Sequence, residues 1–468
     1  MADTDPHDEA ATGGKGSDAA AELLVTLPFW NVALERVGRW ADELDHVRNV
    51  PVEPVDGRPR PGAPASAWAV AKAAVSLAGL PVGISAMAVA ARRAQRITLD
   101  RIDRYPEHLH ALAEGERSPL PANRRRRLPS DRKILITSDL HRCIPGRLDW
   151  PARQSTKSLY HRVLSGYADD EWTLIENGDV EDYWMVGGST WGAVYDVARL
   201  AGGFGGRLAV EPRRELLREH LDRIVDNNAA TYRVIRDGFC ADGRYLRTMG
   251  NHDDVYVDHD LTEHLAHHLP GTEVVDSILL TRPGATDRDG IDGVDAVVTH
   301  GHLTDAWNGP GFALLGRVIT WFATGLDDLP RLGDAVDGLP AEQATGRLLD
   351  GRGRNRLITL DPRYGGNRRF DSLDEERLFE ALAQAPPRGG WPWLVFGHTH
   401  FPMLTPQDAA GIPVRYANSG CGVLDRAFTA LEWDPDAEVP LTLVLWRDGA
   451  NGHERIEMVP DGPLLATA

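Results

Sequence analysis

The sequence predicts an α/β domain that follows a helical N-terminal region. From residue 133 onward, short β-rich apolar runs alternate with segments of helical periodicity, which is the pattern of a layered α/β domain. Five of these runs end directly in acidic, histidine or asparagine side chains. Active sites of open α/β sheets lie outside the carboxyl ends of their strands, so the pattern predicts a functional site there.

The five runs are predicted to be buried strands. Two helices are expected between them: residues 211–239, with Pro212 in the first turn, and residues 373–385, with Ser372 as N-cap and Glu375 completing a capping box. The runs are KILITSDLH (133–141), EWTLIENGDVEDYW (171–184), RYLRTMGNHDD (244–254), VDAVVTHGH (294–302) and WPWLVFGHTH (391–400).

Composition limits the classes of function. The 51 Lys and Arg residues against 69 Asp and Glu residues give a net charge of −18, which disfavours nucleic acid as a partner. The cysteines Cys143, Cys240 and Cys421 lie far apart, which rules out a zinc ribbon or a disulfide framework and favours a reducing compartment. We therefore expect a cytoplasmic protein, with peripheral or anchored membrane attachment as the alternative.

The N-terminal part raises the question of a membrane. Residues 1–21 predict a disordered tail without a secretory signal, and residues 22–121 predict a helical region. Within it, the uncharged segment 73–91 is flanked by basic residues and nearly reaches spanning length, so membrane association, spanning or peripheral, is one hypothesis. The other is a helical pair that turns at Pro81 and packs on the main domain. Residues 122–133 are interpreted as a polar, basic boundary.

His398 and His400 are the first indication of a metal. Residues i and i+2 of a strand share a face, and Gly397 just before them lets a ligand approach the backbone closely. Imidazole is the commonest side-chain metal ligand. Taken alone, however, this pair is equally compatible with ordinary structural histidines.

Taken in order, the five motifs resemble those of the calcineurin-like metallophosphoesterase superfamily over about residues 133–433. Among its branches, GDVEDYW and THGHLTDAW are most similar to the UDP-2,3-diacylglucosamine pyrophosphohydrolase-like branch, whereas Tyr183 and Asp253 differ from the protein phosphatases. The resemblance implies a four-layer α/β/β/α sandwich over 133–435 with a cap-like insertion at about 303–388. Residues 436–468 are expected to form a C-terminal hairpin and tail. The motifs are D-L-H (139–141), G-D-V-E-D (178–182), G-N-H-D (250–253), H-G-H (300–302) and G-H-T-H (397–400).

The resemblance also implies a pair of divalent cations as cofactors. Two such ions about 3.5–4 Å apart can hold a phosphoryl group and activate water. The ligand set mixes carboxylates, imidazoles and an amide, and it suits Mn²⁺, Fe or Zn²⁺ better than Mg²⁺ alone. By this resemblance Asp139, His141 and His400 hold the first ion, Asn251, His300 and His398 hold the second, and Asp179 bridges them.

Catalytic roles are implied in the same way. His252 would stay unligated and act as general acid, and Asp253 would hold its other ring nitrogen. Asp182 is left off the metal list as a supporting or structural residue. His302 is either a substrate contact or a hydrogen-bond partner, and Asn418 is placed near the metals.

The expected activity is that of a hydrolase acting on phosphoric ester or anhydride bonds, with a phosphate monoester, diester or pyrophosphate as substrate. A phosphorylated small molecule or a lipid-linked phosphate would be the partner, and the oligomeric state is open. Residues 312–326 form either a cap over the site or a helix packed on the sheet, and Arg363, Arg368 and Arg369 are candidate phosphate contacts. A non-catalytic metal-binding scaffold and a nuclease are the alternatives.

Overall fold

The computed structural model places every described residue in a single unit of the chain, which comprises residues 91–364 and 373–468. In the part of the chain that it describes, no helix has the length and apolar character needed to cross a membrane. The segments 1–21, 73–91 and 312–326 lie outside that part, so it does not decide between the hypotheses for them. The described residues are 93–145, 149–153, 155–184, 210–305, 308–310, 375–404, 414–424, 426–449 and 452–458.

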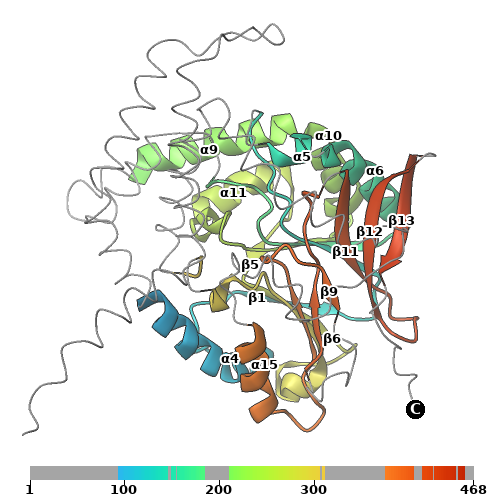
Figure 1. The fold of residues 1–468 in the computed structure, drawn as a ribbon. Coiled ribbons are helices and arrows are strands. Elements are labelled where there is room, and N and C mark those ends of the chain that lie inside the picture. Colours follow the sequence, from blue (N-terminus) through green and yellow to red (C-terminus); the bar gives the residue numbers. More distant parts are fainter. Residues whose placement is uncertain are drawn as a thin grey trace, which may run out of the picture. The chain divides into compact units, whose positions relative to one another are not determined.

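One mixed sheet combines a parallel half with an antiparallel half (Figure 1). Strands β2 to β5 pair in parallel, with Ile136 opposite Ile175. The strands β11, β12 and β13 form an antiparallel meander, and β11 joins it to β2. The sheet order is β13 (Gly452–Met458), β12 (Leu441–Gly449), β11 (Ala427–Trp433), β2 (Ile134–Thr137), β3 (Thr173–Asn177), β4 (Tyr245–Thr248) and β5 (Val274–Val275).

The second sheet is also mixed. Its central strands β7, β8 and β10 are parallel, with Val297 opposite Leu394, whereas β6 is antiparallel to β7 and β9 is antiparallel to β10. The edge strand β1 pairs in parallel with β6. The order is β1 (Arg125–Pro129), β6 (Ser277–Thr281), β7 (Val294–Val298), β8 (Trp393–Phe396), β10 (Tyr416–Asn418) and β9 (Met403–Leu404).

The central strands are buried on both faces, which explains their continuous apolar sequences. Ile136 of β2 and Val395 of β8 belong to one hydrophobic core, which therefore lies between the two sheets. The alternate side chains point away from it: Leu135 packs into a second core with helices, and Leu394 packs into a third. The strand period of two thus distributes each apolar run over two cores.

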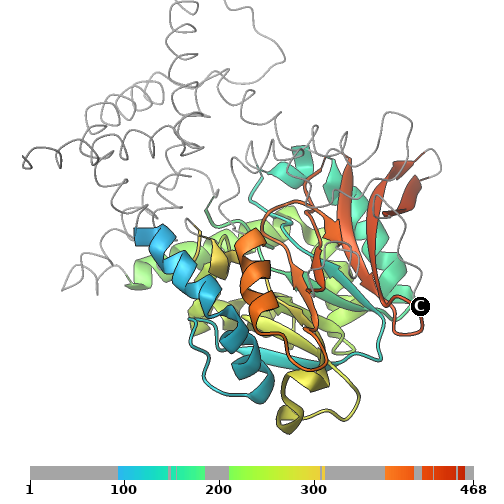
Figure 2. The ribbon, with the colours of Figure 1, turned by 60° about the horizontal axis from the view of Figure 1, so that its bottom comes forward.

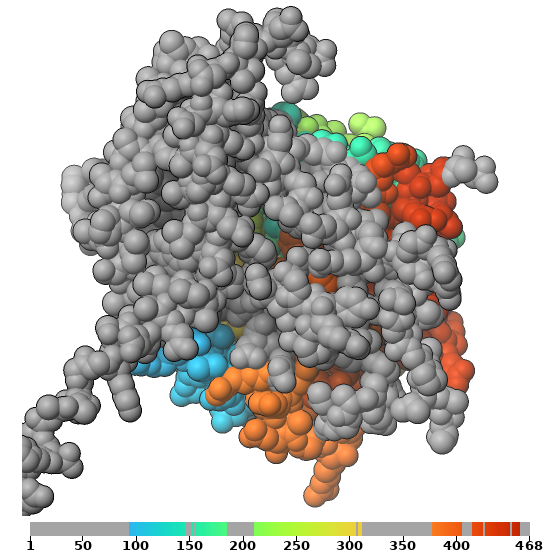
Figure 3. Space-filling view, in the orientation of Figure 1, coloured from blue at the N-terminus to red at the C-terminus, as the bar shows by residue number. Residues whose placement is uncertain are grey.

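Helices cover the outer face of each sheet. The helices α6 (Thr156–Asp169), α9 (Val210–Asn227), α10 (Ala229–Ile235) and α11 (His259–His268) contribute apolar side chains to the core on the seven-stranded sheet. Helices α4 (Tyr105–Glu114) and α15 (Glu375–Gln384) pack on the six-stranded sheet and lie side by side (Figures 2 and 3). The short elements are α5 (Trp150–Arg153), η1 (Arg236–Cys240), η2 (Asp254–Val257), η3 (Asp287–Gly293) and η4 (His302–Thr304).

All five predicted strands are present as β2, β3, β4, β7 and β8, and the terminal hairpin is confirmed as β12 and β13. Three segments outside the five motifs also contribute to the two sheets or pack on them. The basic joint 122–133 contains β1, because its backbone extends the six-stranded sheet. Helix α4, assigned to the region 22–121, packs on the same sheet. The hairpin within 436–468 continues the seven-stranded sheet, because β12 pairs with β11.

The predicted helix at 211–239 is interrupted. Asn228 leaves the helical conformation, with φ −116° and ψ 26°, and its side-chain amide donates to the carbonyl of Ile224. An asparagine side chain that competes for backbone hydrogen bonds favours such a break. The last turns, Arg236–Cys240, form a π-helix. The sequence predicted one continuous helix and did not indicate this interruption.

Candidate metal centre

The five motifs meet where the carboxyl ends of the two sheets come together. The imidazole Nε2 of His300, after β7, lies 3.3 Å from Oδ2 of Asp179, after β3. The backbone N–H of His398, after β8, donates to Oδ2 of Asp139, after β2, at 2.9 Å. Each contact joins a motif of one sheet to a motif of the other. Side chains up to 260 residues apart in sequence are therefore neighbours in one cluster, as the sequence predicts.

Three of the groups of potential ligand atoms among the described residues lie at these strand ends, and within each group the atoms all lie within 4.8 Å of one another. The first two groups reproduce the two predicted ligand sets except for the amide of Asn251, whose Oδ1 lies 3.3 Å from Nε2 of His300. Asp179 belongs to one group with His300 and His398 and to another with His141 and His252, so its carboxylate lies between His141 and the second predicted ligand set. The groups are Asp139, His141 and His400; Asp179, His300 and His398; and His141, Asp179 and His252.

The backbone at these positions is strained. Eight described residues other than glycine have positive φ, and five of them are predicted ligands. Side chains other than glycine rarely adopt this conformation, and each instance costs on the order of 1–3 kcal/mol. Strain concentrated in this way is typical of sites where geometry serves function. The five are Asp139 (52°), His141 (45°), Asp179 (51°), His398 (67°) and His400 (58°).

Glycines in the motifs allow the strands to approach closely. A Cβ atom on Gly250 would overlap the carboxylate of Asp179, and one on Gly397 would overlap Asp139 and Ser138. Gly250 and Gly397 are thus needed because a side chain at either position would collide with the neighbouring motif, and not because their own φ requires glycine. Asn418 supports the same turn, since its amide donates to the carbonyl of Gly397 at 2.7 Å.

Opposite charges are concentrated inside the cluster. Burial opposes ionisation of Asp179, but the imidazoles of His300 and His252 outweigh it and hold the pKa of this carboxyl well below its usual range. Burial disfavours the charged form of His300, yet Asp179 and Asp139 raise its pKa to about 9. The pKa of His400 is likewise raised, against burial, by Asp139. Without a cation, protonated imidazoles balance the buried carboxylates.

His252 is held by contacts on two sides. Its Nδ1 lies 2.9 Å from Oδ1 of Asp182, and its ring stacks on Trp184 with centroids 4.5 Å apart. The rings of His252 and His141 pack edge to face, with their centroids 4.7 Å apart. Burial lowers the pKa of His252, but the carboxylates of Asp182 and Asp179 prevail and raise it to about 9. This imidazole is therefore positioned to carry a proton at neutral pH.

The expected role of Asp253 was wrong. Its Oδ1 accepts from the backbone N–H of Gly250, and its Oδ2 accepts from the N–H of Val180 and from Arg247. The residue is fully occupied in fastening the second and third motifs together, so it does not contact the ring of His252. Asp182 does so instead, because the second motif passes directly beside the third.

Two carboxylates that support histidines were underestimated or missed in the sequence. Asp182 contacts Nδ1 of both His252 and His141, each at 2.9 Å, and the second contact fits the supporting role given to it. Asp305 was not singled out, although its Oδ2 lies 2.6 Å from Nε2 of His398. A carboxylate on the far nitrogen of an imidazole fixes its tautomer and orientation. In the sequence, only the position of Asp305 three residues after His302 indicated that its carboxylate could lie near the cluster.

A fully buried network of charges lies beneath the motifs. Arg247 of β4 pairs with Glu181 of the second motif, and Arg142, directly after the first motif, pairs with Glu176 of β3. Tyrosine hydroxyls complete both pairs. Removing one partner of such a pair leaves an uncompensated buried charge, so the network ties the motif loops rigidly to the sheet. The tyrosines are Tyr232 and Tyr256 on Glu181, and Tyr160 and Tyr245 on Glu176.

His302 remains open between its two predicted roles. Its ring lies 5.4 Å from that of His300, and burial, with His300 and His398 nearby, holds its pKa well below the usual range. Its buried Nδ1 has no hydrogen-bond partner among the described residues. The arginines Arg363, Arg368 and Arg369, considered as phosphate contacts, lie outside those residues.

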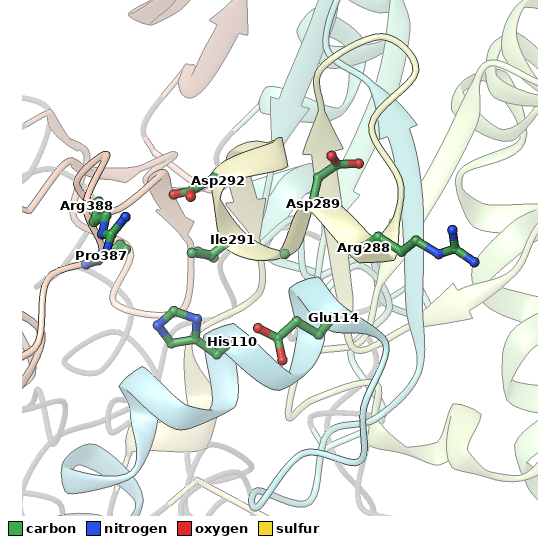
Figure 4. A pocket seen from close by; sticks show the side chains of 9 residues that line it. His110, Glu114, Arg288, Asp289, Ile291, Asp292, Pro387 and Arg388 are labelled. Atoms are coloured by element: carbon green, nitrogen blue, oxygen red, sulfur yellow. The ribbon is translucent and has the colours of Figure 1, made fainter.

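A separate hollow of about 380 Å³ opens between α4, η3 and the loop after α15 (Figure 4). His110 and Glu114 line it from α4, opposite Asp292 and Arg388. None of its lining residues belongs to any group of potential metal ligands found in the described part of the chain. We therefore place the candidate chemistry at the strand ends and not in this hollow.

Comparison with known proteins adds no relative: no family model and no curated protein sequence matches the chain.

Proposed function

We propose that this protein is a metal-dependent phosphoesterase with the four-layer sandwich of the calcineurin-like metallophosphoesterases. The observation that carries the proposal is the convergence of seven predicted ligands, from five separate strand ends, with Asp179 shared between two groups. The two sheets with helices on their outer faces support the same assignment. The five motifs that carry the family resemblance are therefore the same segments whose side chains lie together at the strand ends.

The donor set fits a pair of divalent cations. Oδ1 of Asp139 is buried, has no hydrogen-bond partner among the described residues, and lies 3.3 Å from Nε2 of His400, so a nearby positive charge offsets it in place of a hydrogen bond. Nε2 of His141 and Nε2 of His400 face each other at 3.1 Å, although two such nitrogens have no attraction unless one donates a proton. A cation bound among these three atoms would satisfy all of them. Asp139, His141 and His400 would hold one ion, and His300, His398 and Asn251 the other, with Asp179 between them.

When bound, two such cations supply Lewis acidity, which polarises a phosphoryl group and lowers the pKa of water. The chain's own contribution is positional. The buried network below the motifs and the strained ligand backbones fix the donors before substrate arrives, and preorganised charges of this kind stabilise a transition state without reorganisation.

His252 is the proton donor in this proposal. The carboxylates of Asp182 and Asp179 favour its protonated form against burial, and Asp182 and Trp184 keep the ring in one orientation. The proton on Nε2 would pass to the ester oxygen that leaves phosphorus, and Asp182 would stabilise the charged ring until then. A phosphate monoester, diester or pyrophosphate, on a small molecule or a lipid-linked group, would meet these requirements.

Hydrolysis of p-nitrophenyl phosphate and bis-p-nitrophenyl phosphate with added Mn²⁺, Fe²⁺ or Zn²⁺ tests the proposal. We expect metal-dependent turnover, and chelation should abolish it. Asp179→Asn should lower the turnover rate by at least about two orders of magnitude, because the carboxylate placed between the two ligand sets is lost. His161→Gln, on α6, is the matched control and should behave as the parent protein. Metal binding without turnover of either ester or of pyrophosphate would favour a non-catalytic scaffold instead.

A further inference from the structure

A second cluster of metal-ligating side chains lies on the helices that cover the seven-stranded sheet. His264 and His268 are four residues apart on α11, so they project from the same face of that helix. Asp222 faces them from α9, the neighbouring helix. None of the three belongs to the candidate metal centre or to the five motifs.

The three side chains converge on one point. Nε2 of His264 and Nε2 of His268 each lie 2.8 Å from the same oxygen, Oδ1 of Asp222. The two rings stand nearly perpendicular, at 89°, with centroids 5.5 Å apart. All three ligand atoms lie within 4.8 Å of one another. Two histidines four apart on one helix are a known arrangement for holding a single transition metal.

We propose that His264, His268 and Asp222 form a further metal site, specific for a borderline transition ion such as Zn²⁺, that links α11 to α9. Two imidazoles and one carboxylate suit Zn²⁺, Co²⁺ or Ni²⁺ and not the hard ions Mg²⁺ or Ca²⁺. Three protein ligands leave coordination positions for water. Binding at Nε2 leaves each neutral imidazole with its one proton on Nδ1, so the ring exchanges its tautomer through solvent and no net proton is released.

The charge on Asp222 is available for a cation. Among the described residues no arginine or lysine pairs with Asp222, and its ion-pair partners there are the two histidines. The side chains are 48% exposed for Asp222, 25% for His264 and 27% for His268, so an ion can enter from solvent while the histidines stay packed.

Another acidic group on the same helix shows the contrast. His259, Asp260 and Glu263 also lie near one another, but the side chains of His259 and Glu263 are 82% and 64% exposed. Asp260 is already paired with Arg214 at 2.8 Å, so its charge is neutralised. All three of its potential ligands lie on a single helix, so a metal bound there would not join α11 to a second helix. It therefore provides the internal control for the proposed site.

The site would reinforce the support of the third motif. Helix α9 precedes β4, with α10 and η1 between them, and α11 follows η2, so in sequence the two helices stand on either side of the segment that carries Asn251 and His252. A metal between them would restrain both connections at once. The proposal does not depend on phosphoesterase activity, because it rests on residues outside the candidate centre.

Equilibrium dialysis against Zn²⁺ with metal analysis tests it in the full-length protein. We expect the parent to bind about one more equivalent of Zn²⁺ than the double variant His264→Ala/His268→Ala. Asp222→Asn keeps the shape of the side chain but removes its charge, and it should weaken this binding at least about tenfold. His259→Ala and His267→Ala, on the same helix, should bind Zn²⁺ as the parent does.

Thermal unfolding gives a second readout. Zn²⁺ should raise the Tm of the parent more than that of the double variant, because an ion that binds only the folded state stabilises it. The same one-equivalent difference is expected in an Asp179→Asn background, which separates this site from the proposed dinuclear centre. Equal Zn²⁺ binding by the parent and the double variant would overturn the proposal. So would an equal loss of Zn²⁺ in His259→Ala or His267→Ala.

Discussion

Replacing His252 by glutamine separates proton donation from metal binding. The ring contacts Asp182 and Trp184, and glutamine retains a polar side chain of similar reach. Asp182 keeps its separate contact with His141, so the first ligand group should stay intact. We therefore expect His252→Gln to retain the metal content of the parent protein and to lose turnover.

The size of the loss follows from the state of this imidazole. Burial lowers the pKa of His252, but the carboxylates of Asp182 and Asp179 prevail and raise it, so they favour the protonated ring that the reaction needs. A positioned general acid contributes about 10²–10⁴-fold, which corresponds to about 3–5 kcal/mol of activation free energy. The loss should be larger with an alkyl ester than with p-nitrophenyl phosphate, because the alkoxide needs protonation more.

The assay combines initial rates on p-nitrophenyl phosphate and on an alkyl phosphate ester with metal analysis of the purified variant. The pH profile adds a further check: protonated His252 is lost as pH rises, so the parent should lose turnover at or below about pH 9, since bound cations repel the imidazolium. His252→Gln should lack this descending limb. Metal loss in His252→Gln equal to that in His398→Ala would refute the reasoning, because it would make His252 a ligand. An unchanged rate with the alkyl ester would do the same.

Three further predictions concern neighbouring residues. Asp182→Asn should lower turnover at least about tenfold and reduce metal affinity, measured by rates and dialysis, because it weakens the support of both His252 and His141. Gly250→Ala should lose metal while circular dichroism shows a folded protein, since its methyl group overlaps the Asp179 carboxylate. Burial lowers the pKa of His108 to about 4, so the unfolded chain binds the proton more readily. The free energy of unfolding should fall by up to about 3 kcal/mol between pH 6.5 and pH 4, and His108→Phe should reduce that slope in urea titrations.

The strands and the site could be predicted from sequence because each motif encodes both at once. An apolar run such as LVF in β8 needs burial on both faces, and the polar residues that follow it cannot enter that core. Parallel neighbours then bring these residues to one edge. The same reasoning could not identify β1, because RRRLP has only one side chain, Leu128, in the core, and its strand conformation comes from pairing with β6.

The partners of the histidines were harder to predict. Asp253 directly follows His252, which suggested that the two act together, but neighbours along a turn point in different directions. Asp182 reaches the same ring from 70 residues away, because β3 and β4 pair side by side and their loops run together. Such contacts depend on loop conformation, which sequence periodicity does not specify. The same applies to Asp305 beside His398.

The most direct test is an anomalous diffraction measurement on crystals grown with Mn²⁺. The account predicts two strong peaks about 3.5–4 Å apart, with the carboxylate of Asp179 in contact with both and His252 with neither. A single peak, no peak among these side chains, or two ions that share no carboxylate would contradict it.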